Sequence, residues 1–201
     1  YERHLLPALM DFACGLPRVS AQRRLVVPQA AGRVLEIGIG TGLNLGFYDP
    51  ARIESLVGID PAQALHPRAA RRSVRAGIAV DLVAAGAEQL PLASGTFDSV
   101  VCTYTLCSVA DPAAALAEMR RVLRPGGQLL FAEHGLAPQP QVARWQQRLE
   151  PGWRRLAGGC HLTRDVSWLL RDAGLNAQVE QGYIGGPRLL TYHYWGQARK
   201  S

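Results

Sequence analysis

The chain has almost no lysine and lacks any apolar run long enough to span a membrane. All but one of its 22 basic residues are arginine, the exception being Lys200. Genome composition produces such a bias, so the net charge of +6 is weak support for nucleic acid binding. No run of about 18 apolar residues occurs, and no charged N-terminal segment precedes an apolar one. We therefore expect no nucleic acid partner, no membrane span and no signal peptide.

The cysteines show neither C-x-x-C pairing nor a spacing typical of metal sites. Cys102 lies in an apolar run typical of a strand, and the others are Cys14, Cys107 and Cys160. This spacing of the cysteines is typical of reduced thiols in a cytoplasmic protein, and it predicts no bound metal ion. Cys107 and Cys160 are expected to be buried and inert, with the lining of a pocket as the alternative.

The composition suits one domain with a substantial core, since 48% of the 201 residues are hydrophobic. Two arginine clusters stand out, residues 68 to 75 and residues 144 to 155. We interpret them as solvated helix faces. The alternative is a surface for an anionic substrate or for lipid headgroups, which would give weak peripheral membrane contact.

One stretch joins a short apolar run to three glycines at alternate positions. It runs from Val34 to Asn44 and reads VLEIGIGTGLN. Glycine permits backbone conformations that are costly for other residues and lets a ligand approach the backbone closely. The order of strand, tight turn and helix start predicts a nucleotide site, with a plain glycine turn as the alternative.

A second apolar run ends at Asp60, about 20 residues beyond Gly38. In a βαβ unit this spacing delivers a carboxylate to the ribose hydroxyls of a bound nucleoside. The two features together favour a nucleoside cofactor over a structural turn.

The chain from residue 33 onward alternates between strand and helix patterns. Strands are predicted near 33–38, 55–60, 79–84, 97–103 and 127–133, and helices near 42–48, 62–76, 112–123 and 163–173. After Gly174 the pattern changes to two runs, 177–183 and 188–198, joined by Gly185-Gly186-Pro187 as a hairpin. We therefore predict an α/β, Rossmann-like, seven-stranded, mostly parallel sheet with helices on both faces and a C-terminal antiparallel hairpin.

We expect residues 1–201 to form a single domain with four parts. These are a helical N-terminal lead-in (1–32), a cofactor-binding core (33–134), a roof over the acceptor site (135–175) and the C-terminal hairpin (176–201). The hairpin and the short chain favour a methyl-donating nucleoside over a dinucleotide, because dehydrogenases usually continue with further βα units and a substrate domain.

Five ordered segments resemble the motifs of class I S-adenosylmethionine-dependent methyltransferases. They are Val34–Gly42, Gly58–Pro61, Gly86–Leu92, Thr96–Val101 and Arg121–Gly127. Three further segments resemble the methyltransferase-like alkyl thiol S-methyltransferases within that superfamily. They are Cys102–Val109, Glu133-His134 and Gly159–Arg164.

The resemblance implies S-adenosylmethionine as cofactor, with S-adenosylhomocysteine as product, and a small-molecule methyl acceptor. Gly38, Gly40 and Gly42 would admit the methionyl part, and Glu36 would orient their loop. Asp60 would take the ribose hydroxyls. The adenine would lie beside Ala87, Glu88 and Pro61, and Thr103 would lie beneath the sulfonium.

A thiol is the leading prediction for the acceptor, and its attack requires loss of the thiol proton. His134 and His161 are the predicted catalytic bases, with a structural hydrogen-bonding role as the alternative for each. Other acceptors stay open, namely a phospholipid amine, a quinone or a phenol. A nicotinamide-dependent reductase and a non-catalytic cofactor-binding module are more distant alternatives.

Overall fold

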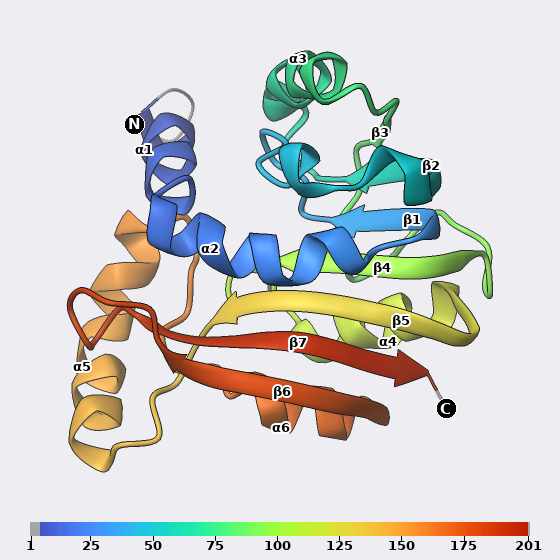
Figure 1. Cartoon of the computed structure of the whole chain (residues 1–201). Helices are drawn as coiled ribbons and strands as arrows, with labels where there is room; N and C mark the ends of the chain where they lie inside the picture. Colours follow the sequence, from blue (N-terminus) through green and yellow to red (C-terminus); the bar gives the residue numbers. More distant parts are fainter. Residues whose placement is uncertain (1–4, 201) are drawn as a thin grey trace.

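The computed structural model describes residues 5–200, so residues 1–4 of the predicted lead-in and Ser201 of the predicted hairpin lie outside the described part. Seven strands form one sheet in the order β3-β2-β1-β4-β5-β7-β6. The first five strands pair in parallel, and β7 runs antiparallel to both β5 and β6 (Figure 1). The strands are β1 (Gly32–Ile37), β2 (Ile53–Ile59), β3 (Asp81–Val83), β4 (Phe97–Thr103), β5 (Leu123–His134), β6 (Leu175–Tyr183) and β7 (Tyr192–Lys200).

Six α-helices surround the sheet in the described residues, with four short 3-10 turns between elements. They are α1 (Leu5–Cys14), α2 (Pro17–Val26), α3 (His66–Ala76), α4 (Pro112–Val122), α5 (Pro140–Leu156) and α6 (Val166–Asp172). Local sequence explains several helix starts. The Asp111 carboxylate accepts the amides of Ala113 and Ala114, both at 3.0 Å, and Pro112 occupies the first turn of α4, where its missing N–H costs nothing.

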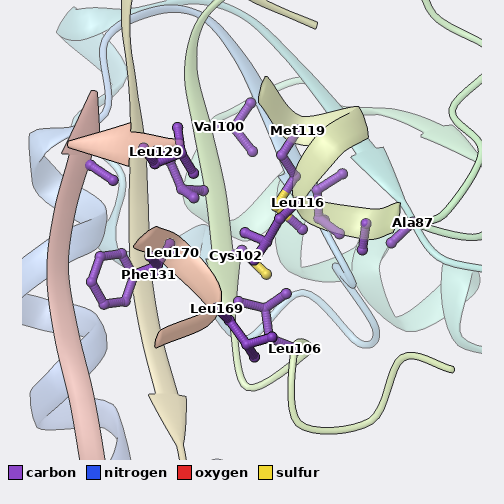
Figure 2. Close-up of a cluster of buried hydrophobic side chains, with 14 of the residues drawn as sticks. Ala87, Val100, Cys102, Leu106, Leu116, Met119, Leu129, Phe131, Leu169 and Leu170 are labelled. Atoms are coloured by element: carbon purple, nitrogen blue, oxygen red, sulfur yellow. The ribbon is translucent and has the colours of Figure 1, made fainter. Parts of the chain in front are cut away.

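Apolar layers lie on both faces of the sheet. On one face, Leu116 and Met119 of α4 and Leu170 of α6 pack onto Val100 and Phe131 of the strands (Figure 2). On the other face, Val26 at the end of α2 packs with Leu56, Val101 and Leu130. Burying each such side chain contributes on the order of 1.5 to 3 kcal/mol, which explains why the central strands are apolar on both faces. The predicted fold class, including the antiparallel hairpin, is confirmed.

The structure corrects two local predictions. Residues 42–48 do not form an α-helix, because only a 3-10 turn at Leu45–Phe47 follows the glycines. Gly46 and the nearby Pro50 leave too few helix-forming residues for a nucleus. The helix α5 is missing from the predicted helix ranges, although the arginine cluster at 144–155 was interpreted as a helix face. Pro151 and Gly152 in its last turns resemble a break in a helical pattern.

Three helices gather at the end of the sheet where the parallel strands finish. Figure 1 shows α1, the start of α2, and α5 beside the carboxyl ends of β1, β4 and β5. In α/β folds, ligands bind at this end of the strands. Among residues 5–200, no helix combines the length and apolar character needed to cross a bilayer.

Candidate functional site

A cavity of about 1100 Å³ opens at the carboxyl ends of the parallel strands. Its lining crosses the sheet from the loops after β1 and β2 to residues of β5, β7 and the end of α5. The lining includes every cofactor residue predicted from sequence except Gly42, namely Glu36, Gly38, Gly40, Asp60, Pro61, Ala87, Glu88 and Thr103. Of the two predicted bases, His134 lines the cavity and His161 is absent from its lining.

The three glycines after β1 all have positive φ, at +69° for Gly38, +54° for Gly40 and +83° for Gly42. They serve different purposes. A Cβ on Gly38 would overlap the side chain of Thr105, and one on Gly42 would overlap Leu45. A Cβ on Gly40 would meet no protein atom closer than 3.8 Å, so a side chain there would enter the cavity. Gly38 and Gly42 allow the loop to pack, whereas Gly40 keeps space open for a ligand.

Asp60 lies at the end of β2, facing the glycine loop. Its Oδ2 atom accepts the amide of Gly40 at 2.9 Å, and its Oδ1 atom accepts the amide of Ala62 at 2.8 Å. Only 9% of the residue is exposed. The carboxylate is therefore held rigidly at the cavity wall with free lone pairs for further donors.

Glu36 is buried at the end of β1 inside a polar network. Its two carboxylate oxygens accept hydrogen bonds from Asn44 at 3.0 Å and Tyr48 at 2.7 Å, and Asn44 also donates to Thr103 at 3.0 Å. Burial raises the pKa of Glu36 to about 7, although the bonds from Tyr48 and Asn44 act in the opposite direction. Glu36 thus ties the glycine loop to the ends of β1 and β4.

The loop after β3 forms the wall beyond Asp60. Ala87 is buried, and the carboxylate of Glu88 accepts the amide of Ala110 at 2.9 Å. Glu88 therefore connects this loop to the segment that leads into α4, and its Oε2 atom is free of protein donors in the described residues. This wall combines apolar surface with a few oriented polar groups, as ligand sites usually do.

The β5 side of the cavity carries a compact group of three side chains, Cys107, His134 and Cys160. Their potential ligand atoms all lie within 4.8 Å of one another, and all three residues are buried. Cys160 Sγ is 3.6 Å from His134 Nδ1, and His134 Nε2 has no hydrogen-bond partner in the described residues. The hydrogen bond from Cys107 lowers the pKa of the Cys160 thiol, and raises that of Cys107. Sequence spacing does not predict this grouping, because the three residues belong to distant segments.

Trp153 of α5 packs against Cys107, Ala157 and Cys160 and lines the cavity. Its indole N–H is buried beside the Cys160 thiol, and this contact helps to lower the pKa of that thiol. Trp145, earlier on the same helix, is 53% exposed and lies under the guanidinium of Arg148. Only Trp153 is thus in a position to contact a ligand.

The hydrogen-bond partners of His161 and Glu133 give both residues a structural role. His161 Nδ1 pairs with Glu150 at 2.9 Å, and the same carboxylate accepts the hydroxyl of Thr163. Glu133 is fully buried and accepts the amides of Thr105, Leu106 and Cys107 at 2.8 to 3.3 Å. Burial raises the pKa of Glu133 to about 7 against those bonds. Glu133 fixes the loop that carries Cys107.

The N-terminal helices close over the cavity. Arg72 of α3 donates to both carboxylate oxygens of Asp11 in α1, at 2.9 and 3.1 Å, and Thr41 of the glycine loop joins the pair. The hydrogen bond from Arg72 lowers the pKa of Asp11. Leu9, Asp11 and Cys14 of α1 line the cavity. Arg72 belongs to the arginine cluster at 68–75, which we interpreted from sequence as a solvated helix face. In the structure it links α1 to the glycine loop.

The cavity fits a nucleoside with a charged tail. It provides open space over Gly40, a fixed carboxylate at Asp60 and an apolar wall at Ala87 and Pro61. Its volume exceeds the roughly 300 to 1,000 Å³ typical of ligand pockets, which leaves room for a second small molecule beside Trp153.

Comparison with known proteins agrees with this geometry. Residues 35–131 match a family model described as a methyltransferase domain. The chain is 34% identical to thiol S-methyltransferase TMT1A of Homo sapiens over 86% of its own length and 72% of that protein. It is 40% identical to thiol S-methyltransferase TMT1B of Rattus norvegicus over 66% of its own length. It spans 55% of that relative, little more than half. A solved geranyl diphosphate methyltransferase in complex with S-adenosylmethionine superposes with a TM-score of 0.70 at 18% identity, covering 90% of this chain and 85% of that one.

Proposed function

Since this chain belongs to the class I S-adenosylmethionine-dependent methyltransferases, we propose that it transfers a methyl group from S-adenosylmethionine to the sulfur of a small thiol. The observation that carries the thiol assignment is the character of the cavity beside Trp153. It is enclosed by apolar and sulfur-containing side chains with His134 among them. The identity to thiol S-methyltransferases supports the same assignment.

The residues on the β1 and β2 side would hold the cofactor. Asp60 would accept the ribose hydroxyls, and charge-assisted bonds of this kind are roughly twice as strong as neutral ones. Gly40 would leave space for the methionyl part, while Ala87, Glu88 and Pro61 would border the adenine. Thr103, fixed by Asn44, would lie beneath the reacting sulfur. When bound, S-adenosylmethionine supplies an activated methyl group on a positive sulfur, so the protein needs no covalent nucleophile.

The main work left to the protein is to hold the acceptor and to promote loss of its proton. A thiolate is the nucleophilic form, and a free thiol with a pKa of about 8.5 is mostly protonated at neutral pH. His134 has an unpartnered nitrogen in the cavity wall, so it is our first candidate for this task. His161 remains a second candidate, although its pairing with Glu150 suits a positioning role.

A second candidate function is methylation of a phospholipid amine or of a quinone or phenol. The observation that favours it is the exposed basic and apolar surface of α5, where Trp145 and Leu149 lie among arginines. Binding to anionic vesicles that weakens with added salt would support this function.

Two measurements test the proposal in order. Calorimetry should detect binding of S-adenosylhomocysteine and none of a nicotinamide cofactor; the reverse result would indicate a reductase. Mass spectrometry after incubation with S-adenosylmethionine and a panel of thiols, amines and phenols should then find methylated thiols. Methylation of only a lipid amine, quinone or phenol would discard the thiol assignment, and binding without any product would indicate a non-catalytic module.

A further inference from the structure

Three side chains from separate elements converge where the proposed thiol acceptor would bind. Cys107 lies in the loop after β4, His134 is the last residue of β5, and Cys160 follows α5. All three are buried, and all three line the cavity. Two thiols and an imidazole are also the side chains that bind Zn²⁺ most often in proteins.

The spacing suits a tetrahedral metal ion. Bond lengths of about 2.3 Å to sulfur and about 2.0 Å to nitrogen place the two ligand atoms about 3.5 Å apart at a tetrahedral angle. Cys160 Sγ and His134 Nδ1 are 3.6 Å apart, and Cys107 completes a set whose atoms lie within 4.8 Å. The remaining separations are at most 4.8 Å, about 1 Å more than a tetrahedral ion requires between two sulfur ligands.

The unsatisfied hydrogen-bonding groups of the His134 ring also point to a ligand. Its Nε2 atom is buried and unpartnered in the described residues, and its other nitrogen makes only the long contact to Cys160. Buried polar atoms without partners are rare in folded proteins, and leaving one unpaired costs about 1 to 3 kcal/mol. The ring packs edge-to-face against that of His193, with centroids 5.8 Å apart, which leaves Nδ1 for a ligand and Nε2 for a water or acceptor.

The surrounding structure holds the two cysteine segments together. Glu133 accepts the amides of Thr105, Leu106 and Cys107, and the amide of His161 donates to the carbonyl of Cys107 at 2.7 Å. Arg164 donates to the carbonyls of Leu106 and Val109. These bonds fix both segments before any ligand arrives, as supporting contacts do around metal sites.

We propose that Cys107, His134 and Cys160 bind one Zn²⁺ ion, and that the acceptor thiol occupies its fourth position as a thiolate. This inference rests on the proposed thiol methylation for the identity of the fourth ligand. Three protein ligands with an open position facing a cavity are the arrangement of catalytic zinc sites, and structural sites use four. In the metal-loaded protein His134 is a ligand, and proton transfer to its ring belongs to the metal-free protein only.

The chemistry balances without any redox partner. The acceptor sulfur replaces water on the metal, its S–H proton passes to solvent, and no electrons are transferred. A thiol that coordinates a zinc ion is deprotonated outright. Two cysteine thiolates neutralise the ion, so the acceptor thiolate adds one negative charge opposite a positively charged methyl donor.

Cobalt provides a direct spectroscopic test, because Co²⁺ takes the same ligands as zinc and is coloured. The reduced, metal-depleted protein of residues 1–201 is titrated with Co²⁺. We expect one equivalent to bind, with a sulfur-to-cobalt charge-transfer band and the intense visible bands of a tetrahedral site, and Zn²⁺ should displace it. Cys107→Ser, Cys160→Ser and His134→Ala should each lose this spectrum. Cys14→Ser, which removes another thiol of the cavity, should keep it.

Thermal unfolding of the metal-free variants checks that each one folds. A thiol count in denaturant confirms that all cysteines are reduced, four in the wild type and one fewer in each Cys→Ser variant. A folded, fully reduced wild-type chain that takes up no cobalt would overturn the site. So would a spectrum that survives in Cys160→Ser or vanishes in Cys14→Ser.

Addition of a small alkyl thiol to the cobalt form tests the fourth position. We expect a shift of the visible bands and a stronger charge-transfer band. Unchanged bands, combined with thiol methylation at the full rate in the presence of a chelator, would contradict the role of the metal while leaving the proposed function intact. Cobalt binding without methylation of any thiol would instead support the metal site and remove the proposed function.

Discussion

The amide of Gly40 donates a hydrogen bond of 2.9 Å to the carboxylate of Asp60, so the glycine loop and the acid after the second strand are in direct contact. The contact places the glycine of this loop whose Cβ would enter the cavity beside the carboxylate expected to hold a ribose. The two halves of the predicted nucleoside site therefore form a single wall.

Replacing Asp60 with alanine should weaken binding of S-adenosylhomocysteine by about 1.5 to 3 kcal/mol, the value of hydrogen bonds to a charged group. Calorimetry measures the loss directly. Asp81→Ala removes an exposed carboxylate at the start of β3 and should leave the affinity unchanged. Equal affinity in Asp60→Ala and wild type would refute the ribose assignment.

Gly40→Ala should reduce cofactor binding with only a modest loss of stability. The new Cβ has no protein atom within 3.8 Å, but it enters ligand space, and its positive φ costs roughly 1 to 2 kcal/mol. Gly77→Ala is a matched control, because Gly77 has a similar φ of +67° at the end of α3 with no atom within 4 Å. Both variants should unfold at similarly lowered temperatures, while only Gly40→Ala should lose affinity. A parallel loss of binding in Gly77→Ala would show that strain alone is responsible.

Glu36 should make stability depend on pH. Because burial raises the pKa of Glu36 from 4.5 to about 7, the folded protein holds this proton more tightly than the unfolded chain. The resulting stabilisation is fully present below pH 4.5 and is lost as the pH rises through 7, a change on the order of 3 kcal/mol.

Glu36→Gln keeps one oxygen that can accept from Asn44, and its new amide can donate to the Tyr48 hydroxyl oxygen, but the side chain cannot ionise. Its free energy of unfolding, measured with urea from pH 4.5 to 8, should fall less steeply with pH than that of wild type. Glu54→Gln, at an exposed position of β2, should follow the wild-type slope. If the free energy of unfolding had the same pH slope in Glu36→Gln and wild type, Glu36 would not be the source of the pH dependence.

Trp153→Ala should raise the acceptor KM and leave the affinity for S-adenosylhomocysteine nearly unchanged, because Trp153 contacts the cysteine side of the cavity. Trp145→Ala removes an equally large side chain from the same helix outside the cavity and should change neither value. If Trp153→Ala weakened cofactor binding and acceptor binding alike, its role would be to pack α5 onto the sheet.

The cofactor side of the site could be predicted from sequence because its residues follow strands that local pattern identifies. Gly38, Gly40 and Asp60 each come directly after a parallel strand, and the sheet brings such positions to one edge. The same reasoning predicted the antiparallel hairpin from two strand-like runs around a glycine-proline turn.

The acceptor side could not be predicted in the same way. Cys107, His134 and Cys160 meet only because α5 returns the chain over the sheet edge, and no local pattern encodes that path. The contact between Asp11 and Arg72 likewise joins residues 61 positions apart. Periodicity correctly placed Arg72 on a helix, but it gave no partner for the side chain.

Transfer of a labelled methyl group to sulfur is the most direct test of the account. The purified chain is incubated with S-adenosylmethionine that carries deuterium in its methyl group and with a small alkyl thiol, and the products are resolved by mass spectrometry. We predict a deuterated methyl thioether and S-adenosylhomocysteine in equal amounts, with both reduced about 10- to 150-fold when Asp60→Ala replaces the wild type at limiting cofactor. Two results would contradict methyl transfer to a thiol. One is binding of S-adenosylhomocysteine with no labelled thioether from any thiol, and the other is label recovered only on nitrogen or oxygen of another acceptor.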